Sequence, residues 1–183
     1  MLLRADARFC STKCRVYSGR KMQFPKQMTE LPRWMRWARV DRGGRLTKEP
    51  RTVHGARGSS MNPAKWSTFE AAKKSTHGAG LGFALGAGIG CIDLDHCIVD
   101  GQLAPWARDI LDRTPATYIE VSQSGTGLHI FGFLPERANR RLRDGEVAIE
   151  VYTGGQYIAA TGDRFERAPL LLADLSEVVA SVT

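Results

Sequence analysis

The chain has 183 residues, of which 43% are hydrophobic, so it is long enough to bury one core, with room for a small appendage. Its net charge of +7 favours polyanionic partners, although charge alone does not separate nucleic-acid binding from an ordinary basic surface. No apolar run approaches the roughly 18 residues of a membrane span, and no secretory signal is visible. A cytoplasmic protein with reduced cysteines is therefore expected.

Residues 1–28 are basic and polar, and they predict an arm or small appendage before a domain over residues 29–183. Cys10 and Cys14 in this arm resemble the second half of a small zinc-binding knuckle. Two thiols cannot complete a tetrahedral zinc site, so zinc binding there stays an open alternative. The other two cysteines are interpreted as core residues: Cys91 and Cys97.

The first half of the domain predicts one helix and two strands after a basic loop. In chain order these elements are an amphipathic stretch over 31–37, a loop over 41–60, a helix over 62–77, and strands over 81–85 and 90–98. Asn62 is a suitable N-cap for the helix, with Pro63 at its first position. The glycine-rich turn at 86–88 between the two strands predicts a hairpin.

The second half mixes helices with pairs of strands. In chain order these are a helix over 104–113, strands over 117–122, 128–133, 148–152 and 156–161, and a helix over 170–182. Short turns between strands favour antiparallel pairing over regular alternation of strand and helix. The sequence therefore predicts the α+β class with a largely antiparallel sheet.

Two aspartates alternate with apolar residues in the predicted strand 90–98. Ile92 and Leu94 would face the core, so Asp93 and Asp95 would share the other face. Carboxylates held together repel unless a cation neutralises them, and Mg²⁺ or Mn²⁺ accepts such oxygen ligands. The alternative is the solvent face of a half-exposed strand.

A loop of hydroxyls and glycines precedes a histidine at the start of the next strand. Glycines allow a close approach of the backbone to a ligand, and exposed N–H groups in such a turn suit phosphate oxygens. The candidate nucleotide-binding residues are Ser122, Ser124, Gly125, Gly127 and His129. The alternative is an ordinary β-turn with a hydrogen-bonded histidine at its edge.

Glu150 is a lone acid in the apolar strand 148–152, and burying it without a partner would be costly. A metal ion would relieve that cost, and so would a nearby arginine. Taken with Asp93 and Asp95, it completes the three acids that two-metal nucleotidyl transfer requires, beside a phosphate-binding loop.

These three motifs, in this order, resemble the archaeo-eukaryotic primase superfamily, and in particular the bifunctional primase–polymerase domains of phages and plasmids. The family pattern is an Asp-x-Asp or Asp-x-Glu strand, a Ser-Gly-x-x-His-like loop and strand, and a lone acid in an apolar strand. Matching residues here are 93–95, 124–129 and 149–152, and the resemblance spans about residues 31–165. It implies an RRM-like sheet packed with a second αβ unit and flanking helices.

The resemblance also implies a function for each motif. Asp93, Asp95 and Glu150 would be catalytic metal ligands for Mg²⁺ or Mn²⁺, and His129 with the serine–glycine loop would contact the incoming NTP or dNTP. The template would be single-stranded DNA, and the place of action the cytoplasm, that of the bacterial host for a phage protein. Relatives often carry a helicase, and no helicase phosphate loop is visible here, so a fragment and a stand-alone module are both open.

Two positions depart from the family pattern. Gly127 stands where many members carry serine, and Gln156 stands where an arginine is expected. Candidate template contacts are the basic residues Arg51, Arg57, Lys65, Lys73, Lys74, Arg140, Arg141 and Arg143, with Trp66 as a stacking side chain. The alternative functions are a metal-dependent nuclease or replication initiator, and a non-catalytic nucleic-acid-binding module.

Overall fold

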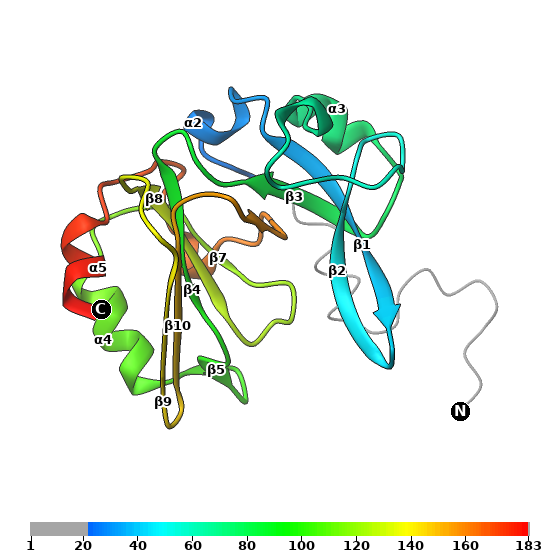
Figure 1. The fold of residues 1–183 in the computed structure, drawn as a ribbon. Coiled ribbons are helices and arrows are strands. Elements are labelled where there is room, and N and C mark those ends of the chain that lie inside the picture. Colours follow the sequence, from blue (N-terminus) through cyan, green and yellow to red (C-terminus); the bar gives the residue numbers. More distant parts are fainter. Residues whose placement is uncertain (1–21, 183) are drawn as a thin grey trace.

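The computed structural model describes residues 22–182, so the predicted arm with Cys10 and Cys14 lies almost wholly outside the described residues. The strands form two larger sheets (Figure 1). The four-stranded sheet has the order β11 (Tyr157–Ile158), β3 (Gly80–Ala84), β1 (Trp34–Arg42), β2 (Arg45–Arg51). The five-stranded sheet has the order β7 (Ile119–Val121), β8 (Leu128–Phe133), β4 (Ile89–Leu94), β10 (Val147–Tyr152), β9 (Arg140–Asp144).

The remaining elements are short. They are the helices α2 (Lys26–Thr29), η1 (Pro63–Lys65), α3 (Phe69–Lys74), α4 (Pro105–Arg113), η2 (Phe165–Arg167) and α5 (Ser176–Val182), and the paired strands β5 (Ile98–Val99) and β6 (Gln102–Leu103). The strands of both larger sheets pair antiparallel, which confirms the predicted α+β class and its antiparallel character.

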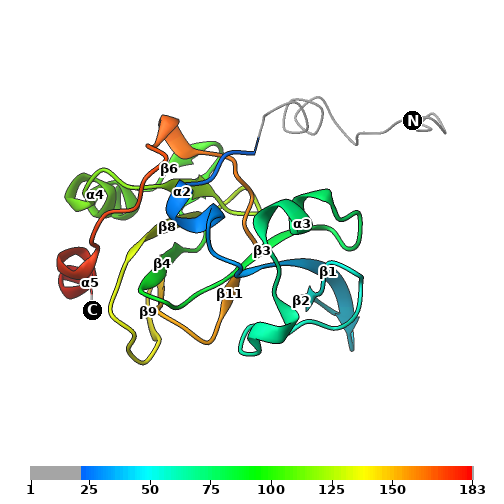
Figure 2. The same cartoon turned by 90° about the horizontal axis from the view of Figure 1, so that it is seen from above.

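Helices α4 and α5 cover one face of the five-stranded sheet, as Figures 1 and 2 show. The alternating residues of the central strands supply this face, for example Ile92, Ile130 and Val151, which are buried. They pack with Ala107 and Ile110 of α4, and with residues of α5. The 2-residue period of the strands thus leaves their other side chains pointing toward the second sheet.

The two sheets meet through an aromatic core that lies between them. Trp34 and Phe83 of the smaller sheet, whose ring centroids are 5.1 Å apart, share one buried cluster with Tyr118 and Phe131 of the larger sheet. Phe24, just before α2, is 4.8 Å from the Trp34 ring centroid and joins the same cluster. This core fixes the position of the four-stranded sheet above one face of the five-stranded sheet.

The predicted hairpin of strands 81–85 and 90–98 is wrong, because β3 and β4 belong to different sheets. The turn itself forms, with mutual backbone hydrogen bonds between Gly86 and Ile89. Just before this turn, the Arg33 guanidinium donates to the carbonyl oxygens of Ala84 and Leu85, at 2.8 and 2.7 Å. These carbonyl groups at the end of β3 are therefore already hydrogen-bonded, and the chain crosses to the second sheet.

Three other predicted elements differ in extent. The helix over 62–77 is split into η1 and α3, because Ser67 exchanges two backbone hydrogen bonds with Trp34 instead of continuing the helix. The strand pair over 148–152 and 156–161 is divided between the two sheets, and β9 was not anticipated. The predicted terminal helix is confined to α5, and the side chain of Asn62 caps η1 as expected.

No helix within residues 22–182 has the length and apolar character needed to cross a membrane.

Gly132 of β8 tests the packing of the sheet against the chain before α5. A Cβ atom there would collide with the Leu175 side chain and lie 2.5 Å from the carbonyl oxygen of Ala173. We expect Gly132→Ala to lower the free energy of unfolding by about 1–3 kcal/mol, measured by urea denaturation. Gly154→Ala is the matched control, because its nearest neighbour would be 3.8 Å away, and equal stability of the two variants would contradict this account.

Candidate active site

Five ionisable side chains lie in a row across the whole five-stranded sheet. The strand register pairs Glu120 with His129, His129 with Asp93, Asp93 with Glu150, and Glu150 with Arg141. Directly paired residues of antiparallel strands project to the same face. The row therefore lies on the face that is turned toward the four-stranded sheet, next to the aromatic core.

The third predicted acid, Asp95, lies one residue beyond β4 and continues its pairing, since its N–H donates to the carbonyl oxygen of Ala148. One nitrogen atom, Nη2 of Arg143, lies 2.9 Å from Asp95 Oδ2 and 3.1 Å from Glu150 Oε1. A single cationic atom thus contacts two of the three predicted metal ligands. Glu150 also pairs with Arg141 at 3.3 Å and accepts a hydrogen bond from the hydroxyl of Tyr152.

Asp93 occupies the centre of the row, and only 18% of its side chain is exposed. Burial raises the pKa of its carboxyl above the ordinary range, His129 opposes the rise, and the negative charges of Asp95 and Glu150 add to it. This repulsion is the electrostatic strain that the sequence predicts for carboxylates held together. Within residues 22–182, no three His, Cys, Asp or Glu side chains are grouped closely enough to hold a metal ion as they stand.

His129 is buried and is held from both sides by carboxylates. Its Nδ1 lies 2.9 Å from Glu120 Oε1, and its Nε2 lies 3.9 Å from Asp93 Oδ1. Burial lowers the pKa of the imidazole, but the hydrogen bond to Glu120 and the charge of Asp93 raise it more, so the pKa lies above its usual value.

A cavity of about 190 Å³ opens beside Asp93 and His129. Its other lining residues come from both sheets and the turn between β10 and β11: Lys48, Tyr152, Gln156, Tyr157, Ile158 and Ala159. Lys48 of β2 places an exposed ammonium group at this cavity. Gln156, which was singled out as a departure from the family pattern, is therefore a wall of the same cavity.

The serine–glycine loop and His129 line different cavities. Ser122, Ser124 and Gly125 line a second cavity of about 700 Å³, together with Asp100 and other residues. The loop is closed by its own hydroxyl groups, since the Oγ atoms of Ser122 and Ser124 are 2.9 Å apart. Of the predicted nucleotide-binding residues, the structure thus brings only His129 to the cavity of Asp93.

Gly127 has a packing reason to be glycine. A Cβ atom there would lie 2.7 Å from the carbonyl oxygen of Leu94 and 3.0 Å from Ser122 Oγ. The close approach keeps β4 and the loop in contact beside Asp95. A serine, as in many members of the family that the sequence resembles, would require the backbone to shift here.

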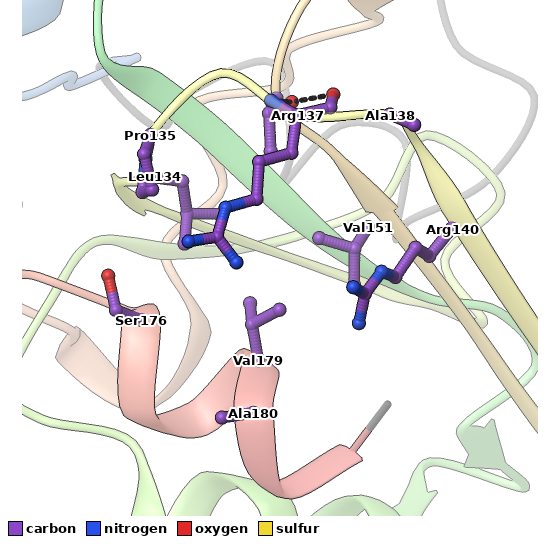
Figure 3. Close-up of a pocket in the computed structure, with 10 residues that line it drawn as sticks. Leu134, Pro135, Arg137, Ala138, Arg140, Val151, Ser176, Val179 and Ala180 are labelled. Carbon is purple, nitrogen blue, oxygen red and sulfur yellow. Dashed lines mark hydrogen bonds between the residues drawn. The ribbon is translucent and has the colours of Figure 1, made fainter.

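A third hollow, of about 310 Å³, lies on the opposite face of the five-stranded sheet. Figure 3 shows Val179 of α5 facing Val151 of β10 across it, with Arg137 and Arg140 at its rim. Because Val151 and Glu150 are neighbours in one strand, they point to opposite faces. This hollow is therefore separate from the row of charges.

Sequence reasoning missed Glu120, Lys48 and Tyr152 as residues of the site. A signal for Glu120 was present, because Tyr118-Ile119-Glu120 places a lone acid in an apolar strand, as Glu150-Val151-Tyr152 does. In both strands the tyrosine hydroxyl donates to the glutamate two residues away. Lys48 gave no such signal, because it is one of many basic residues in the first half of the chain.

The aspartate pair, the histidine strand and the lone glutamate thus converge on one sheet face. The chain is similar to a phage DNA primase-polymerase. That protein, from Nitratiruptor phage NrS-1, is 32% identical over 157 residues, which cover 79% of this chain. The chain spans about a fifth of the relative's length, since the match covers 21% of it. No protein-family model matches the chain.

This similarity supports the relationship to phage primase–polymerases that the three motifs indicate.

The raised pKa of His129 predicts how stability depends on pH in a chelating buffer. A group whose pKa is raised by folding stabilises the protein fully below its unfolded value, about 6.5 for histidine, and loses this effect as the pH rises through the folded value. The free energy of unfolding should therefore fall as the pH is raised from about 6.5 through the neutral and mildly alkaline range.

Urea denaturation across this range measures the fall. His129→Asn, which keeps a donor for Glu120 but does not titrate, should flatten the profile. The exposed His54 supplies the control, and His54→Asn should retain the wild-type slope. Equal slopes for wild type and His129→Asn would contradict the assignment.

Proposed function

We propose that this chain is the catalytic domain of a template-directed nucleotidyl transferase, a DNA primase–polymerase of phage or plasmid replication. It joins NTPs or dNTPs on a single-stranded DNA template in the cytoplasm of the host. The five-stranded sheet with α4 and α5 would be the RRM-like core, and the four-stranded sheet would be the additional unit. The observation that carries the proposal is the row of Asp93, Glu150 and His129 in direct register, beside a cavity with a lysine opposite.

The carboxylates fit divalent metal ions by their chemistry. Asp93, Asp95 and Glu150 offer hard oxygen atoms, which Mg²⁺ and Mn²⁺ prefer. Asp95 and Glu150 already share one cationic atom, Nη2 of Arg143, which shows that one positive centre can contact both. When bound, such ions would lower the pKa of the attacking hydroxyl group and neutralise the charge of the leaving pyrophosphate.

The side chains of the protein supply binding and orientation. His129 presents Nε2 to the cavity, where it can donate a hydrogen bond to a phosphate oxygen, and Lys48 adds a positive charge from the opposite sheet. Tyr152 holds the Glu150 carboxylate by its hydroxyl group. Because nucleotidyl transfer needs no covalent enzyme intermediate, such positioning and charge neutralisation can account for its catalysis.

Substitution of the central acid tests the proposal. We expect Asp93→Asn to lower primer synthesis and primer extension on single-stranded DNA by about a hundredfold or more, because charge compensation at the reacting atoms is lost. Asp112→Asn on α4 is the matched control, since Asp112 is an exposed acid on the other face of the sheet. Equal activity of Asp93→Asn and wild type would overturn the proposal.

The same assay separates the alternatives. Labelled DNA incubated without nucleotides is shortened by a nuclease and left intact by a polymerase.

Loss of folding does not explain a loss of activity in Asp93→Asn, because the neutral amide removes a buried charge that is repelled by its neighbours. In chelator this variant should melt no lower than wild type.

Metal binding has a readout that does not depend on activity. Mn²⁺ at a hundredfold excess over its Kd should raise the melting temperature of the wild type by about 5–10 °C. Asp95→Asn and Glu150→Gln should lose most of this shift, and Asp112→Asn should retain it. A shift that persists in both site variants would show that the ion binds elsewhere.

A further inference from the structure

Glu120 is a fully buried carboxylate that none of the sequence motifs contains. Its exposed fraction is 0%, yet three donors are directed at it. Oε1 accepts from the N–H of Thr161 at 3.1 Å and lies 2.9 Å from His129 Nδ1. Oε2 accepts from the hydroxyl of Tyr118 and from the N–H of Gly162, both at 2.8 Å. Both oxygen atoms of this buried acid are therefore surrounded by hydrogen-bonding groups of the protein.

This arrangement determines which nitrogen of His129 faces the cavity. Because three donors already point at the Glu120 carboxylate, a proton on His129 Nδ1 completes the set of hydrogen bonds around it. Nε2 is then the atom directed toward Asp93 and the cavity.

Glu120 also connects the histidine to one wall of the cavity. Its two backbone donors, Thr161 and Gly162, begin two residues after Ala159, which lines the cavity with Ile158. The carboxylate therefore fixes the position of the imidazole relative to this wall of the cavity. A network with all partners satisfied is rigid, because each change leaves a buried polar group without its hydrogen bond.

We propose that Glu120 is a positioning residue for nucleotide binding: it holds His129 by Nδ1 so that Nε2 meets a phosphate of the incoming nucleoside triphosphate. This rests on the proposed function, in which the cavity beside Asp93 receives that nucleotide. Glu120 itself does not touch the substrate, since it is enclosed by protein groups. Its effect passes entirely through His129.

A double-mutant cycle distinguishes this role from a merely structural one. The variants are Glu120→Gln, His129→Ala and the combination, and the measurement is the Kd of dATP with Mg²⁺ by calorimetry. We expect Glu120→Gln to weaken dATP binding about tenfold, the size expected for losing a hydrogen bond to a charged group. In the His129→Ala background the same change should alter the Kd of dATP by less than about twofold, because the imidazole through which Glu120 acts is absent.

Tyr118→Phe is the matched control. It removes one hydrogen bond from the same carboxylate but leaves the bond to His129 intact. It should lower the melting temperature while leaving the Kd of dATP within about twofold of wild type. In contrast, ¹⁵N NMR should show the Nδ1 proton of His129 in wild type and Tyr118→Phe, and its loss or displacement in Glu120→Gln.

The outcomes separate the two proposals. A wild-type protein that binds no dATP overturns the proposed function and the phosphate contact with it. Binding that is equal in wild type and Glu120→Gln, or equally weakened by that change in both backgrounds, overturns only the role of Glu120. Should Glu120→Gln not fold, His129→Gln takes its place, because its amide can replace Nε2 but offers no donor to Glu120. A wild-type Kd in that variant would overturn the proposal.

Discussion

The register of strands β8, β4 and β10 is the constraint on which the site depends. Each of His129, Asp93 and Glu150 has a directly paired neighbour in this row, so a slip of one residue would turn the slipped side chain to the helix-covered face. On the opposite face, strands β8, β4 and β10 present buried apolar side chains to α4 and α5, so such a slip would bury a charge there. The core that stabilises the sheet therefore also holds the charges in line.

Charge on this face is tolerated because each acid has a partner of a different kind. Glu120 is satisfied by backbone and side-chain donors, Glu150 by arginines and a tyrosine, and Asp93 by a histidine at a longer distance and the charge of Lys48. Asp93 is thus the acid of the row with the least complete compensation, and its raised pKa reflects this. The arrangement thus grades the acids along a single line by how completely the protein compensates their charge.

The direction of the side chains in each strand could be predicted from local sequence periodicity, but the pairing of the strands could not. The alternation of Ile92 and Leu94 with Asp93 indicated which face each side chain takes, because side-chain direction in a strand depends only on neighbours in sequence. The assignment of β3 and β4 to different sheets comes from pairing with strands that are remote in sequence, β1 and β11 for β3 and β8 and β10 for β4. Glu120 was missed for a similar reason, since two of its donors come from the distant segment after β11.

Strand β9 has a further consequence as the outer strand of the five-stranded sheet. All five of its residues are exposed, and three of them are arginines. An unpaired outer edge is a template on which another chain can add a strand, and clustered positive charge opposes this by repulsion between identical copies. The same charge would not repel a polyanion, so this margin discourages self-association while remaining open to a strand of nucleic acid.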